Sequence, residues 1–337
     1  MLHLNKVLFS SSLALGTLIA VSSYSWMGMW LGLEINLLSF MPLICSNNNI
    51  LSSESALKYF ITQAMASSLL LFSLILFSMN SPYFIELESF LNLILNSSLL
   101  LKMGAAPLHF WFPEVMEGLS WFNGFVLLTW QKIAPMALLL YSSKTTVLIL
   151  VTIVSCMIIS GVMGQNQLSL RKIMAYSSIN HIGWMLAAMM FLETVWLLYF
   201  IVYSLITSNI LVMFKKLNIF SVNQMTMAIK NQPHFKLFFS LNFLSLGGLP
   251  PFLGFFPKWL VIQVLINKNL FMLSAVMILA TLMTLFFYIQ LTFSSLIFST
   301  NTSFPTKNTS RHMFFVASSN LAALVSLILV TLVFNFL

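Results

Sequence analysis

Residues 244–260 read LSLGGLPPFLGFFPKWL, and this stretch decides which kind of fold the sequence predicts. It is apolar enough for a membrane interior, yet it contains residues that loosen a helix and remove backbone donors. These residues are Gly247, Gly248, Pro250 and Pro251. Unpaired backbone at membrane depth is tolerated only where it faces protein or a water-filled cavity. The stretch therefore predicts a membrane helix that is interrupted beside Lys258.

A second interruption with the same composition lies earlier in the chain. Residues 99–114 read LLLKMGAAPLHFWFPE, where Lys102 is followed by Gly104 and Pro107. Two breaks that each lie beside a lysine are typical of transporters, in which discontinuous helices mark the conducting path. The alternative interpretation is a pair of simple proline kinks.

The rest of the chain predicts a polytopic helical membrane protein. Its 337 residues are 59% hydrophobic and 7% charged, with a mean hydropathy of +0.96. Long apolar runs recur, each close to the roughly 20 residues that cross a ~30 Å hydrocarbon core, and they favour helices over a membrane barrel. The eleven predicted spans are approximately 3–23, 26–45, 57–78, 89–109, 121–141, 146–164, 173–191, 195–214, 237–265, 270–293 and 313–335.

The two breaks fall in the fourth and ninth spans, so the second break lies five helices after the first. An odd number of helices returns a repeat to the opposite face, which predicts two inverted five-helix repeats. We therefore expect one all-α membrane domain over 1–337, with repeats at 1–142 and 146–298 and a final helix at 312–337. The first 23 residues resemble a secretory signal, but they are long enough to cross the bilayer and ten further spans follow.

The formal charge of +8 suggests either nucleic-acid binding or membrane orientation. With eleven spans, the loops on the N-terminal side of the membrane hold far more basic residues than the loops on the opposite side. This favours orientation by the positive-inside rule, with the N-terminus on the negative side of the membrane. The N-terminal side holds Lys6, Lys58, Arg171, Lys172, Lys215, Lys216, Lys230, Lys236, Lys307 and Arg311, and the opposite side holds Lys144 and Lys268.

Redox and nucleotide chemistry have no visible motif. Cys45 and Cys156 are about 110 residues apart and match no zinc or iron–sulfur spacing. Neither a dinucleotide-binding glycine motif nor a phosphate-binding loop is present. We expect no cofactor and no metal in this chain. The energy that the protein uses must then be supplied from outside the chain.

Four charged residues fall inside predicted spans: Glu34, Lys102, Lys132 and Lys258. Each costs on the order of 3 kcal/mol at a helix centre, so the four cost roughly 10 to 12 kcal/mol without compensation. Ion pairing that merely locks the helices together is the alternative, but three lysines and one glutamate cannot all neutralise one another. The charges therefore predict a functional role.

Proton transfer is the chemistry that such groups support. Burial weakens a lysine's hold on its proton and a nearby carboxylate restores it, so moving a partner or admitting water can switch the group. We expect Glu34 and Lys102 to form the switchable pair, with Lys132 and Lys258 as successive carriers. His109 and His181 are secondary candidates; His181 is either a member of a water wire or an ordinary interhelix hydrogen-bond partner.

Six motifs resemble one known family. In chain order they read LGLEINLLSFMPL, SALKYFITQAMASS, KMGAAPLHFWFPEVMEGL, TWQKIAPM, LRKIMAYSSINHIGWML and LSLGGLPPFLGFFPKWL. Together they are similar to the antiporter-like membrane subunits of respiratory complex I, NADH:ubiquinone oxidoreductase, and most to subunit 2 of the animal mitochondrial enzyme. The likeness covers about residues 20–290 and identifies the same four charged residues as the proton path.

The resemblance implies proton translocation across the mitochondrial inner membrane, coupled to electron transfer from NADH to ubiquinone. It implies that NADH, FMN, the iron–sulfur clusters and ubiquinone are held by other subunits, that adjacent membrane-arm subunits and lipids are the partners, and that no nucleic acid is bound. It also implies an N-terminus on the matrix side and a C-terminus on the intermembrane-space side. A stand-alone cation/proton antiporter and a purely structural membrane-arm spacer remain alternatives.

Overall fold

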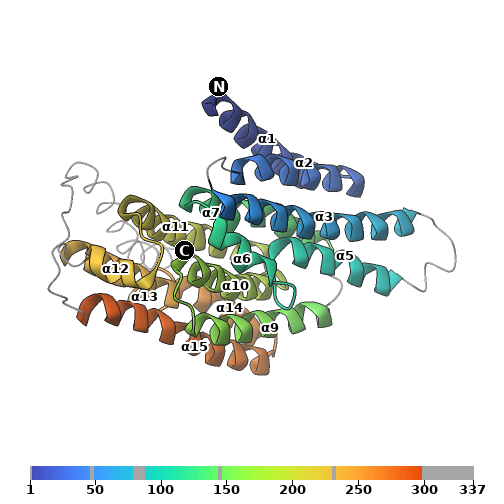
Figure 1. Ribbon diagram of the computed structural model, residues 1–337. Helices are drawn as coiled ribbons and strands as arrows, with labels where there is room; N and C mark the ends of the chain where they lie inside the picture. Colours follow the sequence, from blue (N-terminus) through green and yellow to red (C-terminus); the bar gives the residue numbers. More distant parts are fainter. Residues whose placement is uncertain (1, 46–48, 79–87, 143–145, 230–232, 298–337) are drawn as a thin grey trace, which may run out of the picture. The chain divides into compact units, whose positions relative to one another are not determined.

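The computed structural model describes residues 2–45, 49–78, 88–142, 146–229 and 233–297 (Figure 1). These residues fold into α-helices, and within these ranges no β-strand forms; Ser169 and Ser221 make only an isolated antiparallel bridge. The predicted all-α class is confirmed. The last predicted span, 313–335, and the final helix predicted at 312–337 lie outside the described residues, as do Lys144, Lys230, Lys307 and Arg311.

The chain divides into two compact units, Met1–Cys156 and Met157–Leu337, and the division falls within one helix, α9. The repeat boundaries predicted at 142 and 146 stay a prediction. The first unit contains α1 (Leu2–Ser22), α2 (Trp26–Ile44), α3 (Ile50–Ser78), α5 (Glu88–Met103), α6 (Trp111–Gly118), α7 (Trp121–Leu128), α8 (Trp130–Tyr141) and the first half of α9 (Thr146–Gln165).

The second unit continues from α9 and shows the same kind of interrupted helix. Its helices are α10 (Leu170–Met189), α11 (Glu193–Leu217), α12 (Val222–Ile229), α13 (Pro233–Gly247), α14 (Phe255–Asn267) and α15 (Phe271–Ile297). α10 is buried along nearly its whole length even though it carries Ser177, Ser178, Asn180 and His181. A central helix with polar side chains is therefore the core of this unit.

Among the described residues, seven helical stretches are long and apolar enough to cross a membrane by length and composition, so the chain is a multi-pass membrane protein. They coincide with predicted spans, and they are Leu4–Ser22, Trp26–Ile44, Ile50–Ser78, Trp121–Tyr141, Thr146–Gln165, Glu193–Leu217 and Phe271–Phe293. The predicted span 89–109 instead consists of the short helix α5 followed by a break, and the span 237–265 consists of the short helices α13 and α14 separated by a break.

Both predicted interruptions are confirmed. α5 ends at Met103, and Gly104 turns the chain with a φ of +73°; α13 ends at Gly247, and Gly248 does the same with a φ of +80°. Left-handed backbone at the residue after a helix is the usual role of glycine there. With 16 residues in α5 and 15 in α13, each helix is shorter than the roughly 20 residues of a full crossing.

A third interruption was not predicted. The span expected at 121–141 is divided at Thr129, which takes a φ of −118° and a ψ of −68° between α7 and α8. The Thr129 hydroxyl donates to the Phe125 carbonyl at 2.8 Å, a back-bond that bends helices. This bend lies three residues before Lys132.

Close backbone contact joins the first two helices. A Cβ atom added at Gly32 would lie 2.5 Å from the Ala20 nitrogen and 2.8 Å from the Gly16 carbonyl oxygen. Only a hydrogen therefore fits at Gly32, and α1 and α2 pack with their backbones nearly in contact, as small residues allow in membranes.

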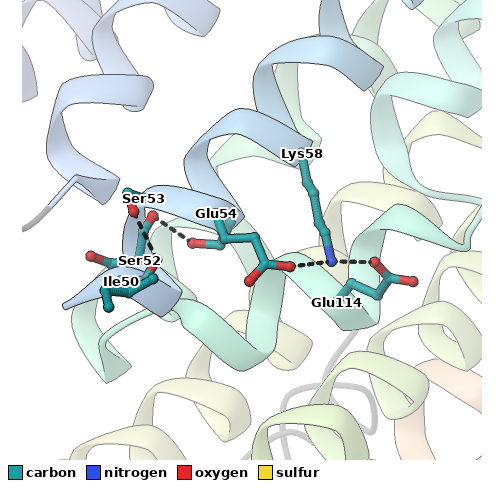
Figure 2. A network of polar contacts seen from close by, with 7 residues as sticks. Ile50, Ser52, Ser53, Glu54, Lys58 and Glu114 are labelled. Atoms are coloured by element: carbon teal, nitrogen blue, oxygen red, sulfur yellow. Dashed lines mark hydrogen bonds and ion pairs between the residues drawn. The ribbon is translucent and has the colours of Figure 1, made fainter.

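An exposed ion bridge ties α3 to α6, the short helix that follows the first break. Figure 2 shows the Lys58 ammonium between two carboxylates, 2.9 Å from Glu54 and 2.8 Å from Glu114. Nearby, a Cβ atom at Gly118 of α6 would lie 2.4 Å from the Leu51 carbonyl oxygen of α3. The end of α6 is thus pressed against α3, and the ion bridge lies beside this contact.

Candidate functional site

The three predicted lysines are buried within helices. Lys102 lies in the last turn of α5 with 6% of its surface exposed, Lys132 lies in α8 with 1%, and Lys258 lies at the start of α14 with 5%. Lys102 therefore precedes its break, whereas Lys258 follows its own. Neither arrangement leaves the ammonium in bulk water.

The carbonyl groups at the end of α5 are satisfied by neutral side chains. The last carbonyls of any helix lack intrahelical donors. Here the Trp111 indole donates to the Leu101 oxygen at 3.2 Å, and the Gln63 amide donates to the Lys102 oxygen at 3.3 Å. The first break is thus fixed by α3 and α6 without using the Lys102 ammonium.

The irregular backbone after Gly104 is held by α9. The Ala106 nitrogen donates to the Cys156 sulfur at 3.1 Å, and the Ser155 hydroxyl donates to the Ala106 oxygen at 2.8 Å. Both polar groups of this buried residue are therefore paired, as non-helical backbone at membrane depth requires. Cys156, for which sequence reasoning found no use, supports the break.

Lys132 lies under an aromatic ring that the first break positions. Its nitrogen is 5.5 Å from the centroid of the Phe112 ring, within the range of a cation–π interaction. A Cβ atom at Gly104 would lie 2.9 Å from that same ring. The glycine of the break thus contacts the ring that covers Lys132, and α5, α6 and α8 meet here.

Glu34 lies half-buried in α2. Among the described residues its Oε1 atom is buried without a hydrogen-bond donor, and neither of its oxygens lies within 4.0 Å of the Lys102 nitrogen. The carboxylate nevertheless lies close enough to act electrostatically on Lys102 and Tyr59. The two predicted partners therefore occupy one neighbourhood without a direct ion pair.

A small polar cavity of about 10 Å³ lies between α2 and Lys102, roughly the space of one water molecule. Across it the Gln131 amide donates to Asn36 at 2.9 Å, and the Tyr59 hydroxyl donates to Gln131 at 3.4 Å. The cavity is lined by Leu33, Asn36, Leu37, Tyr59, Gln63, Lys102, Gln131 and Pro135. Because Gln131 precedes Lys132 in the chain, these bonds link the helix of Lys132 to that of Glu34, and Lys102 lines the same cavity.

Sequence reasoning missed Asn36, Gln63 and Gln131. All three are amides inside apolar spans, and a buried amide without a partner is costly for the same reason as a buried charge. Had polar residues within spans been searched along with charged ones, this signal would have found them.

Lys258 lies against the backbone of the second break. Its nitrogen donates to the Leu246 oxygen at 3.2 Å and to the Gly247 oxygen at 2.8 Å, and it is 5.9 Å from the centroid of the Trp184 ring. These acceptors belong to the end of α13, and Trp184 belongs to α10. Three helices of the second unit therefore enclose this ammonium.

The two histidines have different surroundings. The buried His109 ring lies in the first break, with Nδ1 3.2 Å from the Pro107 oxygen and the ring against Phe110. His181 Nδ1 is 2.8 Å from the Tyr199 hydroxyl, and its ring packs 4.9 Å from that of Tyr203. His181 is thus an interhelix hydrogen-bond partner, and nothing in this geometry opposes a further role in a water wire.

Next to His181, Asn180 donates to the Thr284 hydroxyl at 3.3 Å, while its buried Oδ1 atom has no donor among the described residues. Lys132 belongs to the first unit and His181, Asn180 and Lys258 belong to the second, so transfer between the units stays a prediction. No group of three or more metal-ligating side chains occurs in the part of the chain that the structure describes.

Comparison with known proteins points to one family. A family model described as NADH:quinone oxidoreductase/Mrp antiporter, TM, matches residues 23–284. Similar curated proteins include the NADH-ubiquinone oxidoreductase chain 2 of Anopheles gambiae, 51% identical over 87% of this chain and 86% of that protein. The protein of the same name from Aedes aegypti is 47% identical over 99% of both chains.

The solved structures show the same fold. A chain of respiratory complex I from Thermus thermophilus with bound aureothin matches with a TM-score of 0.84, over 95% of this chain and 77% of that chain. The sequence identity is 22%, so this likeness concerns the fold alone.

Proposed function

The chain belongs to the NADH:quinone oxidoreductase/Mrp antiporter family, and we propose that it is a proton-translocating membrane subunit of mitochondrial NADH:ubiquinone oxidoreductase. In this role the chain forms part of the enzyme and carries no redox centre. NADH, FMN, iron–sulfur clusters and ubiquinone belong to other subunits. Adjacent membrane-arm subunits and lipids are its partners.

The observation that supports this proposal most is the burial of three lysines beside interrupted or bent helices. Lys102, Lys132 and Lys258 are at most 6% exposed, and each costs on the order of 3 kcal/mol at a helix centre. Packing alone does not require them, because apolar residues of similar volume usually serve as well or better. Groups that gain and lose protons account for their presence.

In the proposed mechanism, electron transfer elsewhere in the enzyme changes the hydration of the cavity between α2 and Lys102. A water beside Lys102 lets the proton affinity of its ammonium respond to the nearby Glu34 carboxylate. The proton then passes through Lys132 to Lys258, with His109 and His181 as secondary members. Moving one charge against 100 mV takes about 2.3 kcal/mol, which a modest change in proton affinity supplies.

The proposed location is the mitochondrial inner membrane, with the N-terminus on the matrix side. The excess of basic residues on the N-terminal side of the predicted spans supports this orientation. Lys215 and Lys216, in the last turn of α11, would then face the matrix.

Lys132→Met tests the proposal in the assembled enzyme. The substitution keeps a long, flexible side chain and removes the ammonium, so we expect at least about a tenfold loss of proton pumping and of ubiquinone reduction. NADH oxidation by an artificial acceptor should continue, because it needs no membrane subunit. The exposed Lys268→Met is the matched control and should leave every rate unchanged. Normal pumping by Lys132→Met would contradict the relay.

The family description also covers antiporters, which keeps a stand-alone cation/proton antiporter as a second candidate. Proton-coupled cation transport by the isolated chain in liposomes would favour it. A structural spacer is the third possibility, and neutral substitutions at all four charged positions would then alter only assembly. Co-migration of the chain with a large NADH-oxidising complex supports the first proposal over the antiporter.

A further inference from the structure

The end of α13 uses a lysine where a helix normally uses backbone or water. The Gly248 nitrogen donates to the Leu244 and Ser245 oxygens at 3.1 and 3.0 Å, so the next two carbonyls, Leu246 and Gly247, lie beyond the backbone ladder. Lys258 Nζ donates to both of these carbonyls, at 3.2 and 2.8 Å. The ammonium thus caps the helix from 11 residues away.

This position suits a positive charge without any carboxylate. The C-terminus of a helix carries a partial negative charge, and the two carbonyl oxygens concentrate it on the nitrogen of Lys258. The Trp184 ring, 5.9 Å away, offers the face that attracts cations. Backbone and one ring therefore compensate a charge that is 5% exposed.

Gly248 is the residue that leaves room for the lysine. A Cβ atom there would lie 2.8 Å from Lys258 Cδ and 2.9 Å from Nζ, so the side chain lies directly across the glycine. These are atoms of a flexible side chain, and a bulkier residue would displace the lysine more readily than the backbone. A Cβ atom at Gly254 would lie 1.8 Å from the Ser245 oxygen, so the start of α14 is held tightly against α13.

The first break differs in this respect. At the end of α5 the Leu101 and Lys102 carbonyls accept from the neutral side chains of Trp111 and Gln63, and Gly104 faces Phe112 instead of a lysine. The contrast between the two breaks shows that an interrupted helix can be capped without an ammonium. The use of Lys258 at the second break is therefore a specific feature of that site.

We propose that the carbonyl end of α13 is a binding cradle for a primary ammonium, occupied in this chain by Lys258, and that Gly248 is the residue that positions Lys258 in it. The inference rests on the proposed function, because the cradle holds the protonated form of a carrier in the relay. The ligand class is a small cation with N–H donors.

The first experiment displaces the lysine without removing it. We choose Gly248→Asn because asparagine adopts the left-handed backbone conformation more readily than other non-glycine residues do. The Cβ atom of the asparagine would nevertheless occupy the space of the Lys258 side chain. We expect about a tenfold loss of pumping in the assembled enzyme, because the ammonium loses two charge-assisted hydrogen bonds. Gly124→Ala is the matched control, since Gly124 lies outside the cradle and a Cβ there meets only the flexible end of the Met116 side chain, at 3.3 Å. Equal pumping by the two variants would overturn the inference.

The second experiment empties the cradle and refills it. In Lys258→Ala, methylammonium should restore part of the pumping and raise the thermal stability of the enzyme by binding the freed carbonyls. Tetramethylammonium has no N–H donor and should do neither. Adding Gly248→Asn to Lys258→Ala should abolish the response to methylammonium. An equal response to both cations, or no response in either measurement, would overturn the inference.

The two readouts separate this inference from the proposed function. If Lys258→Ala pumps as well as the wild type, the role of Lys258 in the relay is wrong. Selective stabilisation by methylammonium would still support the cradle in that case, and its absence would count against the cradle alone.

Discussion

Glu34 is the one carboxylate among the four charged residues predicted at membrane depth. Its Oε1 atom is buried without a hydrogen-bond donor among the described residues. Lys102 interacts with this carboxylate electrostatically, without a direct ion pair. A carboxylate in this condition is poised to accept a donor, either a water or the lysine itself after a small movement. The role proposed for Glu34 therefore depends on its charge more than on its shape.

Glu34→Gln separates these two properties. The amide keeps the shape of the side chain and removes the negative charge, so Lys102 loses its electrostatic partner. We expect the enzyme to assemble and its proton pumping to fall at least about tenfold. Pumping would be followed with a pH-sensitive dye in proteoliposomes.

The matched control is Glu193→Gln, at the exposed start of α11. Wild-type pumping is expected from this control. If Glu34→Gln also pumped normally, the carboxylate would have no part in the switch, even if the lysines still carried protons.

The sequence indicates which residues are candidates for the site, but it does not indicate which residues contact one another. Glu34, Lys102, Lys132 and Lys258 stand out because a charge in an apolar span is costly in any fold. Their partners do not stand out in this way. Gln131 meets Asn36 across 95 positions of sequence, and no local pattern predicts that pairing.

At the scale of elements, the interrupted helices depend on neighbours that hold their irregular backbone. The first break is supported by α9, where Ser155 and Cys156 pair with both polar groups of Ala106. Losing the Ser155 hydroxyl leaves the buried Ala106 carbonyl with only a weak thiol donor, Cys156 at 3.8 Å, and an under-satisfied buried carbonyl costs about 1–3 kcal/mol. The support is thus large compared with the contribution of an ordinary surface contact.

Ser155→Ala should accordingly lower the stability of the first unit by about 1–3 kcal/mol, because the Ala106 oxygen then has no hydroxyl donor. The effect is measured by heating the purified enzyme and using proteolysis to detect the temperature at which this chain unfolds. Ser208→Ala is the control, since the Ser208 hydroxyl is exposed and bonds only within its own helix. Equal melting of the two variants would show that α9 does not stabilise the break.

The breaks at Gly104 and Gly248 could be predicted because glycine and proline act locally, through the backbone of their own residues. The bend at Thr129 could not, since it depends on one rotamer of a common side chain that bonds back to Phe125. The capping of α13 by Lys258 could not be predicted from the sequence either, because it requires the chain to fold back across the break.

At the scale of the whole molecule, both units contain a helix that ends in a left-handed glycine and resumes a few residues later. The composition predicted the membrane class and the helical fold, because burying a polar backbone in lipid permits few other structures. The inverted relation of the two repeats stays a prediction from the odd number of helices, five, in each predicted repeat.

The central claim is that Lys102, Lys132 and Lys258 are kept at membrane depth because they exchange protons, and protons reach them only through water or polar side chains. Cryo-electron microscopy of the assembled enzyme, resting and during turnover, at a resolution that reveals ordered water, tests this claim most directly. We predict water in the cavity beside Gln131 and at each of the three lysines in at least one state. A dry interior around all three lysines in both states would contradict the claim.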